Sequence, residues 1–180
     1  MGYGLGLGLG VIILADIDMI GIGAYGCKLA VYIANRPPLE SYVSREKLVP
    51  ATVGELAHIG KEVGNHWRKI INIYGKLGFM LATEGFSTWQ EYRDHFLLTG
   101  GAKQALLFNE CIASDIEGCL HIVMGKAHSL KLLGDDELIW VDSDFAISRE
   151  RRIIVTPYFD YRQLSNMKLE KLVGILKGFD

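Results

Sequence analysis

An asparagine and an arginine follow a short apolar segment, and side chains of these two types can hold a ligand by hydrogen bonds. Residues 29–34 (LAVYIA) have the composition of a buried β-strand, and Asn35 and Arg36 come directly after it. Pro37 and Pro38 then restrict the path of the chain, so that neighbouring polar groups lose little entropy on binding. Ligands of open α/β sheets bind at the carboxyl ends of strands. The segment therefore indicates either a binding site at this strand end or a capped strand followed by a rigid loop.

A glycine pattern just upstream resembles a phosphate-binding loop. Residues 21–26 (GIGAYG) match GxGxxG, and Glu46 lies 20 residues after the last glycine. A dinucleotide site needs a helix directly after this motif, because the helix N-terminus holds the pyrophosphate. A β-branched stretch that ends at Pro37 follows instead. Dinucleotide binding is therefore the weaker interpretation of these glycines.

The composition is that of one globular domain without a general affinity for nucleic acid. The chain has 180 residues, of which 49% are hydrophobic, which is enough for one sizeable core. Its formal net charge of −2 gives no overall attraction to nucleic acid, but basic residues are concentrated in the last third of the chain. These are Arg149, Arg151, Arg152, Arg162, Lys168, Lys171 and Lys177. They leave two interpretations open, a local basic face or an ordinary solvated helix surface.

The cysteines and histidines do not form a pattern typical of a metal or disulfide site. Cys27, Cys111 and Cys119 are odd in number and include no CxxC pair, which argues against a disulfide framework, a zinc site and a four-cysteine iron–sulfur cluster. His121 and His128 lack a carboxylate partner at a known ligand spacing. We therefore expect no cofactor and no metal, and the free thiols fit a reducing cytoplasm.

The first 27 residues differ from the rest of the chain. Glycine occupies every second position from Gly2 to Gly10, and Asp16 and Asp18 interrupt any membrane span. We expect a glycine-rich leader over residues 1–27. It is either the product of a translation start assigned too early, with the real domain beginning near Met19 or Lys28, or a flexible or edge-strand extension. No targeting segment is evident. A single α/β domain over residues 28–180, cytoplasmic and without a membrane partner, is the resulting expectation.

Hydrophobic periodicity predicts the elements that position these residues. Helices are expected at residues 63–81, 88–98, 102–114, 127–133 and 164–176, and strands at 29–34, 119–124, 137–141 and 152–156. Residues 40–57 are expected to be irregular, with one short helical turn. Strands that alternate with helices predict an α/β fold, namely a three-layer α/β/α sandwich with a short, mainly parallel central sheet.

In such a sheet three strand ends meet at one edge. They are residues 34–36, 124–126 and 156–158. Asp160 and Arg162 lie just beyond the third strand end, and the start of the long helix could close over all three. The sequence therefore predicts a pocket built from segments far apart in the chain.

Four of these segments resemble, in order and spacing, the uracil-DNA glycosylase superfamily, particularly its mismatch-specific and thymine-DNA glycosylase branch. That branch has a strand ending in G-I-N-P-G, a G-N-x-F-W start of a helix, a strand-to-helix G-K turn, and a strand ending in a P-S-S-S-x-R or H-P-S type motif. The matching segments here are residues 33–37 (IANRP), 64–69 (GNHWRK), 124–127 (MGKA) and 156–162 (TPYFDYR). The resemblance covers about residues 28–178.

The resemblance implies hydrolysis of the N-glycosidic bond of a flipped or free nucleotide, with DNA, a nucleotide or a nucleoside as the partner. Asn35 falls on the family's water-positioning asparagine, and it would accept with its oxygen and be anchored through its NH2. Arg36 and Arg162 would contact phosphate or the leaving base. The remaining residues of the implied pocket are Tyr42, Asn65, His66, Trp67, Lys126, Tyr158 and Asp160. Among these, Tyr42 or Trp67 would stack on a base; the alternative is that these aromatic residues belong to the hydrophobic core.

Departures from the family motifs leave the chemistry open. Ile33 stands where the family has its first glycine, and Pro37 where it has its second. The small hydroxyl residues of the last motif are replaced by Tyr158, Phe159 and Asp160, whose rings would crowd a phosphate and whose carboxylate would repel it. The sequence therefore indicates a divergent glycosylase acting on a free nucleoside or modified base, or a non-catalytic nucleotide- or nucleic-acid-binding module of the same fold.

Overall fold

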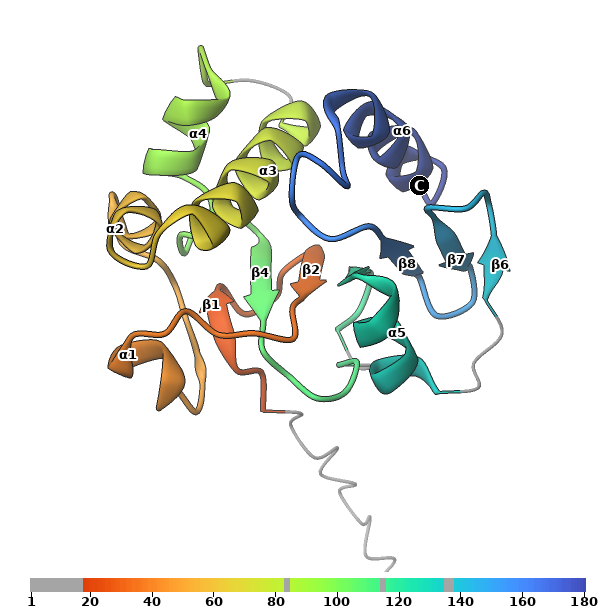
Figure 1. Ribbon diagram of the computed structural model, residues 1–180, viewed down its shortest axis with the longest axis horizontal. Coiled ribbons are helices and arrows are strands. Elements are labelled where there is room, and N and C mark those ends of the chain that lie inside the picture. The colour runs from red at the N-terminus through yellow and green to blue at the C-terminus, as the bar shows by residue number, and fades with distance from the viewer. Residues whose placement is uncertain (1–17, 83–84, 114–115, 135–137) are drawn as a thin grey trace, which may run out of the picture.

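The computed structural model describes residues 18–82, 85–113, 116–134 and 138–180. These residues form one mixed sheet of eight strands in the order β3-β1-β4-β2-β5-β8-β7-β6, together with six helices (Figure 1). The strands are β1 (Gly21–Gly23), β2 (Leu29–Tyr32), β3 (Leu48–Val49), β4 (Gln104–Leu107), β5 (Leu120–Met124), β6 (Ile139–Trp140), β7 (Ala146–Ser148) and β8 (Ile153–Thr156). The helices are α1 (Glu40–Val43), α2 (Glu55–Glu62), α3 (Asn65–Leu81), α4 (Trp89–His95), α5 (Lys126–Leu133) and α6 (Asn166–Lys177).

The four central strands, β4, β2, β5 and β8, are parallel. Val31 of β2 lies opposite Leu106 on one side and Ile122 on the other. Nearly every residue of these strands is buried, which explains their continuous apolar sequences. Shorter strands extend the sheet at both edges, with antiparallel pairing of β1 to β4 and of β7 to β8.

Helices cover both faces of the sheet, as an α/β fold requires. Val31 and Ile122 belong to one buried cluster, which also contains the apolar residues of α2, α3, α4 and α6. Ala30 and Val123, which point the other way, belong to a second and smaller cluster that includes Leu133 of α5. The general α/β prediction is therefore confirmed.

The prediction of a helix over residues 102–114 is wrong, because this segment contains β4. Its apolar run, QALLF, is short and has no polar face, and periodicity alone does not separate such a buried strand from a buried helix. The strands β3 and β7 were not predicted either. They have two and three residues, too few for a periodic signal.

The expected start of the domain at residue 28 is too late. Strand β1 precedes it, and Gly21 pairs with Leu48 and with Leu107 in neighbouring strands. The GxGxxG motif is followed by β2 rather than by a helix, so the structure does not build the dinucleotide site that this motif can form. Residues 1–17 of the expected leader lie outside the described residues.

The long amphipathic elements agree with their predictions. Helix α3 lies within the predicted range of 63–81, and α6 coincides closely with 164–176. Thr88 caps α4 through its hydroxyl, which accepts a hydrogen bond of 3.1 Å from the backbone N–H of Glu91. Within the described ranges, no helix has the length and hydropathy needed to cross a membrane.

His121 on β5 makes the stability of the fold depend on pH. Its Nδ1 is 2.9 Å from the hydroxyl of Tyr32. Burial, with smaller contributions from Arg151 and Arg152, lowers the pKa of His121 from 6.5 to about 4. The unfolded chain therefore binds a proton between pH 6.5 and 4 that the folded chain does not bind, so stability is full above pH 6.5 and is lost as the pH falls through this range.

We expect this histidine to cost the folded protein about 2 kcal/mol between pH 7 and pH 5. The measurement is the free energy of unfolding in urea at both pH values. His121→Gln keeps a hydrogen-bonding group beside Tyr32 but does not titrate. Between pH 7 and pH 5 the free energy of unfolding of this variant is therefore expected to fall by about 2 kcal/mol less than that of the wild type. The exposed His58, replaced by glutamine, serves as the control. The same pH slope in wild type and His121→Gln would contradict the assignment.

Candidate functional site

The carboxyl ends of β2, β5 and β8 lie side by side at one edge of the sheet. Tyr32 pairs with Val123, and Met124 pairs with Thr156. The backbone N–H of Gly125 donates a 2.9 Å hydrogen bond to the carbonyl of Thr156. The predicted meeting of these three strand ends is thus confirmed.

Asn35, Tyr158 and His66 form a chain of polar contacts at this edge. The hydroxyl of Tyr158 is 3.1 Å from Nε2 of His66, and the two rings stack with their centroids 5.6 Å apart. The side chain of Asn35 lies close enough to the same hydroxyl to lower the pKa of Tyr158 by hydrogen bonding. Three residues from three distant motifs of the sequence are thus in contact.

The direction of these hydrogen bonds follows from the pKa of Tyr158. Burial raises this pKa, the bond with Asn35 lowers it, and the charge of Asp160 raises it. A hydrogen bond that lowers the pKa of a phenol is one that the phenol oxygen accepts, so the amide NH2 of Asn35 donates to Tyr158. Tyr158 keeps its own proton, which it can donate to Nε2 of His66. The carbonyl oxygen of Asn35 is left to accept from another donor.

Two glycines allow this arrangement. Gly64 has φ of 88° directly before α3, which places His66 in the first turn of the helix. Gly125 has φ of 91° directly before α5, and an added Cβ there would lie 3.7 Å from the ring of Tyr158. Both backbone conformations are in the left-handed region that favours glycine. The backbone conformation therefore favours glycine at positions 64 and 125, in addition to the resemblance of these positions to the G-N and G-K motifs.

Asp160 and Arg162 lie beside Tyr158, but the carboxylate is already paired. Lys69 Nζ is 2.9 Å from Oδ2 of Asp160, and the other carboxylate oxygen accepts from the backbone N–H of Arg162. These two contacts, the Arg162 N–H first, lower the pKa of Asp160. The expected repulsion between Asp160 and a phosphate is therefore reduced. The side chain of Arg162 is exposed and remains a candidate for a phosphate contact.

Phe159 does not crowd this edge as the sequence led us to expect. It is completely buried and packs edge-on against Tyr74, with ring centroids 6.1 Å apart. Only Tyr158 of the two aromatic residues faces the site.

Arg36 has a structural role in place of the predicted contact with phosphate or a leaving base. Its Nη1 donates to the carbonyl oxygens of Tyr42, Val43 and Arg45, at 3.2, 2.9 and 2.8 Å. These carbonyls lie at and just beyond the C-terminal end of α1, where helical partners are lacking. The guanidinium therefore fixes the loop that follows β2.

Replacing Arg36 with alanine is expected to lower the free energy of unfolding by about 2 kcal/mol, because the carbonyls of Val43 and Arg45 lose this donor and that of Tyr42 keeps only backbone donors. Chemical denaturation measures this change. Arg162→Ala is the matched control, since that guanidinium is exposed, and a change within about 0.5 kcal/mol is expected for it. An Arg36→Ala protein as stable as the wild type would contradict the structural role.

The predicted base-stacking roles of Tyr42 and Trp67 are wrong. The two residues are 4% and 3% exposed and belong to the core cluster under α3. The hydroxyl of Tyr42 donates to Glu55 at 2.6 Å. Aromatic residues at helical spacing are here core residues, the alternative that the sequence left open.

Asn65 and Lys126 lie near the edge but contact other groups. The side-chain oxygen of Asn65 accepts a 2.7 Å hydrogen bond from Arg68, and Asn65 lines a hollow between α2 and α3. The ammonium of Lys126 is 4.9 Å from the ring centre of Trp140. The structure therefore joins neither side chain to the contacts around Asn35.

A cavity of about 780 Å³ lies at the ends of β2 and β4, and the chain neighbours of Asn35, Ala34 and Arg36, line it whereas Asn35 itself does not. Such a volume is within the range of pockets for small ligands. Its lining residues are Ile20, Ile33, Ala34, Arg36, Phe108, Asn109, Glu110, His128, Lys131 and Leu132. The sequence did not indicate this cavity, because residues 102–114 were expected to be helical. Two polar residues, Asn109 and Glu110, follow Phe108 after β4; they parallel Asn35 and Arg36 after β2 and would have been the signal.

His128 is the unsatisfied polar group of this cavity. Both ring nitrogens are buried, and neither has a hydrogen-bond partner within the described part of the chain. Burial, and then the charge of Lys131, lowers the pKa of His128, so its neutral ring has one donor and one acceptor. Asn109, in contrast, is fully engaged with the backbone of Asp18 and Ile20. His128 is therefore the side chain best placed to bind a polar ligand in this cavity.

The residues that the structure describes include no group of three or more His, Cys, Asp or Glu side chains that could hold a metal ion.

A family model described as "Family of unknown function (DUF6942)" matches residues 20–177. No curated protein and no solved structure matches the chain. The match begins at residue 20, directly before β1, which agrees with a domain that starts before residue 28.

Proposed function

The chain belongs to the DUF6942 family, whose function is unknown, and we propose that it hydrolyses the N-glycosidic bond of a nucleoside or nucleotide. The substrate is either free or flipped out of DNA. The observation that carries the proposal is the anchored amide of Asn35 at the carboxyl edge of the parallel strands. Its NH2 can donate to the hydroxyl of Tyr158, which leaves its oxygen to accept from a further donor.

This arrangement suits the chemistry of glycosidic cleavage. The reaction passes through an oxocarbenium-like sugar, so a water must be held near the anomeric carbon. The oxygen of Asn35 would accept a proton of that water and orient its lone pair, while Tyr158 and His66 prevent the amide from rotating. The departing base needs hydrogen-bond donors, and His128 and Lys131 line the cavity next to Asn35. Arg162 is available for a phosphate.

A second candidate is binding of a nucleotide or nucleic acid without cleavage. The observation in its favour is that the ring of Tyr158 stacks on His66 where the resemblance has small hydroxyl residues. In this case the cavity beside Asn35 binds the ligand, Arg162 contributes to affinity, and the amide of Asn35 has only a structural contact.

Base release separates the two candidates. The protein is incubated with DNA oligonucleotides that contain uracil, mismatched thymine or hypoxanthine, and with the corresponding free nucleosides, and liberated base is separated by chromatography. We expect the protein to release free base from at least one of these substrates. Binding without release, weakened by Arg162→Ala and unchanged by Asn35→Ala, would establish the second candidate in its place.

A further inference from the structure

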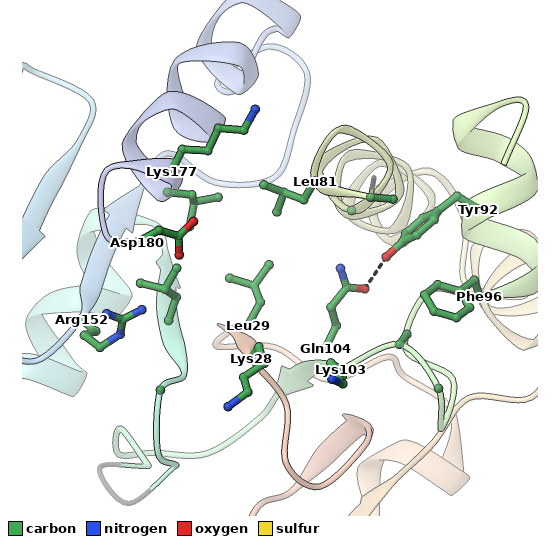
Figure 2. A pocket seen from close by; sticks show the side chains of 17 residues that line it. Lys28, Leu29, Leu81, Tyr92, Phe96, Lys103, Gln104, Arg152, Lys177 and Asp180 are labelled. Carbon is green, nitrogen blue, oxygen red and sulfur yellow. Dashed lines mark hydrogen bonds between the residues drawn. The ribbon is translucent and has the colours of Figure 1, made fainter. Parts of the chain in front are cut away.

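A second cavity lies at the opposite edge of the sheet, where the parallel strands begin (Figure 2). It has a volume of about 480 Å³ and is bordered by Leu29 of β2, Gln104 of β4, Leu120 of β5 and Arg152 just before β8. Because Asn35 follows the carboxyl end of β2, the two cavities are separated by the length of the parallel strands. The second cavity is therefore a separate site, and the inference below does not depend on the proposed function.

The walls of this cavity are apolar and its borders are mainly cationic. Leu29, Leu81, Phe96, Leu120 and Leu176 supply the apolar surface. Four basic residues line it, namely Lys28, Lys103, Arg152 and Lys177, against the single carboxylate side chain of Asp180. The chain as a whole has a formal net charge of −2, so this excess of positive charge is local. It favours a ligand that has an apolar body and a negative charge.

A buried amide donor is directed into the cavity. Gln104 is only 9% exposed, and its side-chain oxygen accepts a 2.9 Å hydrogen bond from the hydroxyl of Tyr92. Burial raises the pKa of Tyr92 to about 12, so this hydroxyl keeps its proton. The contact fixes the orientation of the amide, and Figure 2 shows the nitrogen of Gln104 turned away from Tyr92 toward the space between the helices. A ligand that accepts hydrogen bonds would satisfy this donor.

Two of the basic residues have unfavourable backbone conformations. Lys103 has φ of 20° and Arg152 has φ of 54°, and Leu98 is the only other non-glycine residue with positive φ in the described ranges. Glycine at either position would remove this strain. The Nε of Arg152 is moreover buried without a hydrogen-bond partner within those ranges. Strained cations and an unsatisfied donor thus border the same cavity.

We propose that this cavity binds a small organic anion with an apolar body, of the kind represented by a medium-chain carboxylate. The apolar part would lie against Leu81, Phe96 and Leu176, and the anionic group would lie near the donors of Gln104, Lys103 and Arg152. The remaining basic residues would contribute through longer-range attraction. The single carboxylate of Asp180 opposes binding of the anion.

Isothermal titration calorimetry with octanoate tests this proposal on the full chain, with octanol as the neutral probe of the same length. Octanoate is expected to bind with a dissociation constant below about 1 mM, and octanol much more weakly. Lys103→Met is expected to weaken octanoate binding about fivefold, and Asp180→Asn to tighten it about twofold or more. Leu81→Trp, which fills the apolar part, should abolish binding.

Lys61→Met on the exposed face of α2 is the control and should leave the affinity unchanged. Thermal unfolding shows whether each variant is folded. Lys103 and Asp180 are both exposed, so the opposite changes in octanoate affinity expected at these positions do not require a substitution in the core. No heat of binding with octanoate at millimolar concentration would overturn the proposal. Equal affinity for octanol and octanoate, or equal affinity of Lys103→Met and Lys61→Met, would also overturn it.

Discussion

Replacing Asn35 with alanine is expected to lower the rate of base release by about a hundredfold or more, with little effect on substrate binding. The oxygen that orients the attacking water is lost, while the cavity and Arg162 remain. The measurement is single-turnover release of free base from whichever substrate the wild type cleaves. Because chemistry rather than binding is affected, kcat is expected to fall and KM to change little.

The matched control for this variant is Asn166→Ala. Asn166 is an exposed asparagine at the start of α6, and its side-chain oxygen accepts a hydrogen bond from Lys76 rather than from a residue of the site. Its replacement is expected to leave the rate unchanged. Tyr158→Phe removes the hydroxyl that contacts both Asn35 and His66 but leaves the oxygen of Asn35 in place, so a smaller loss of about tenfold is expected. Release by Asn35→Ala at the rate of the Asn166→Ala control would contradict the role of Asn35.

Gly21→Ala is expected to destabilise the fold by at least about 3 kcal/mol. An added Cβ would lie 2.0 Å from the carbonyl oxygen of Leu106 and 3.0 Å from its carbon. Both are backbone atoms of β4, so relief of the clash requires separation of β1 from the sheet. The measurement is the free energy of unfolding in denaturant, with the slope compared to that of the wild type.

Gly26→Ala provides a control from the same glycine motif. Its φ of 73° is left-handed, but an added Cβ there would meet no atom within 4 Å. Only the conformational cost of about 1 kcal/mol is therefore expected. Small and equal effects of the two substitutions would show that β1 is not packed against β4 as described.

The elements that the sequence predicted are those with a long or strongly bounded pattern. Helix α3 has apolar residues at helical spacing over 17 residues, and β2 and β8 are apolar runs stopped by prolines. Strand β4 was missed because a buried run of four residues has the same composition as a turn of buried helix. Strand β1 was missed because its glycines are needed for close approach to β4, a contact that no local pattern shows.

The sequence predicted the parts of the candidate site that follow from the direction of the strands. It did not predict the parts that depend on where individual side chains point. The meeting of Asn35, His66 and Tyr158 follows from parallel strands whose carboxyl ends share an edge. Arg36 is adjacent to Asn35 in the chain but turns to the carbonyls of the next loop, whose path is set by tertiary packing. The cavity with His128 required the correct position of β4, which the sequence did not provide.

The most direct test of the central claim is a side-by-side measurement of base release by the wild type and Asn35→Ala under single-turnover conditions, with substrate binding measured on the same samples. We expect both proteins to bind the substrate equally and only the wild type to release base at a measurable rate. Equal rates in the two proteins, or binding by both without release by either, would contradict it.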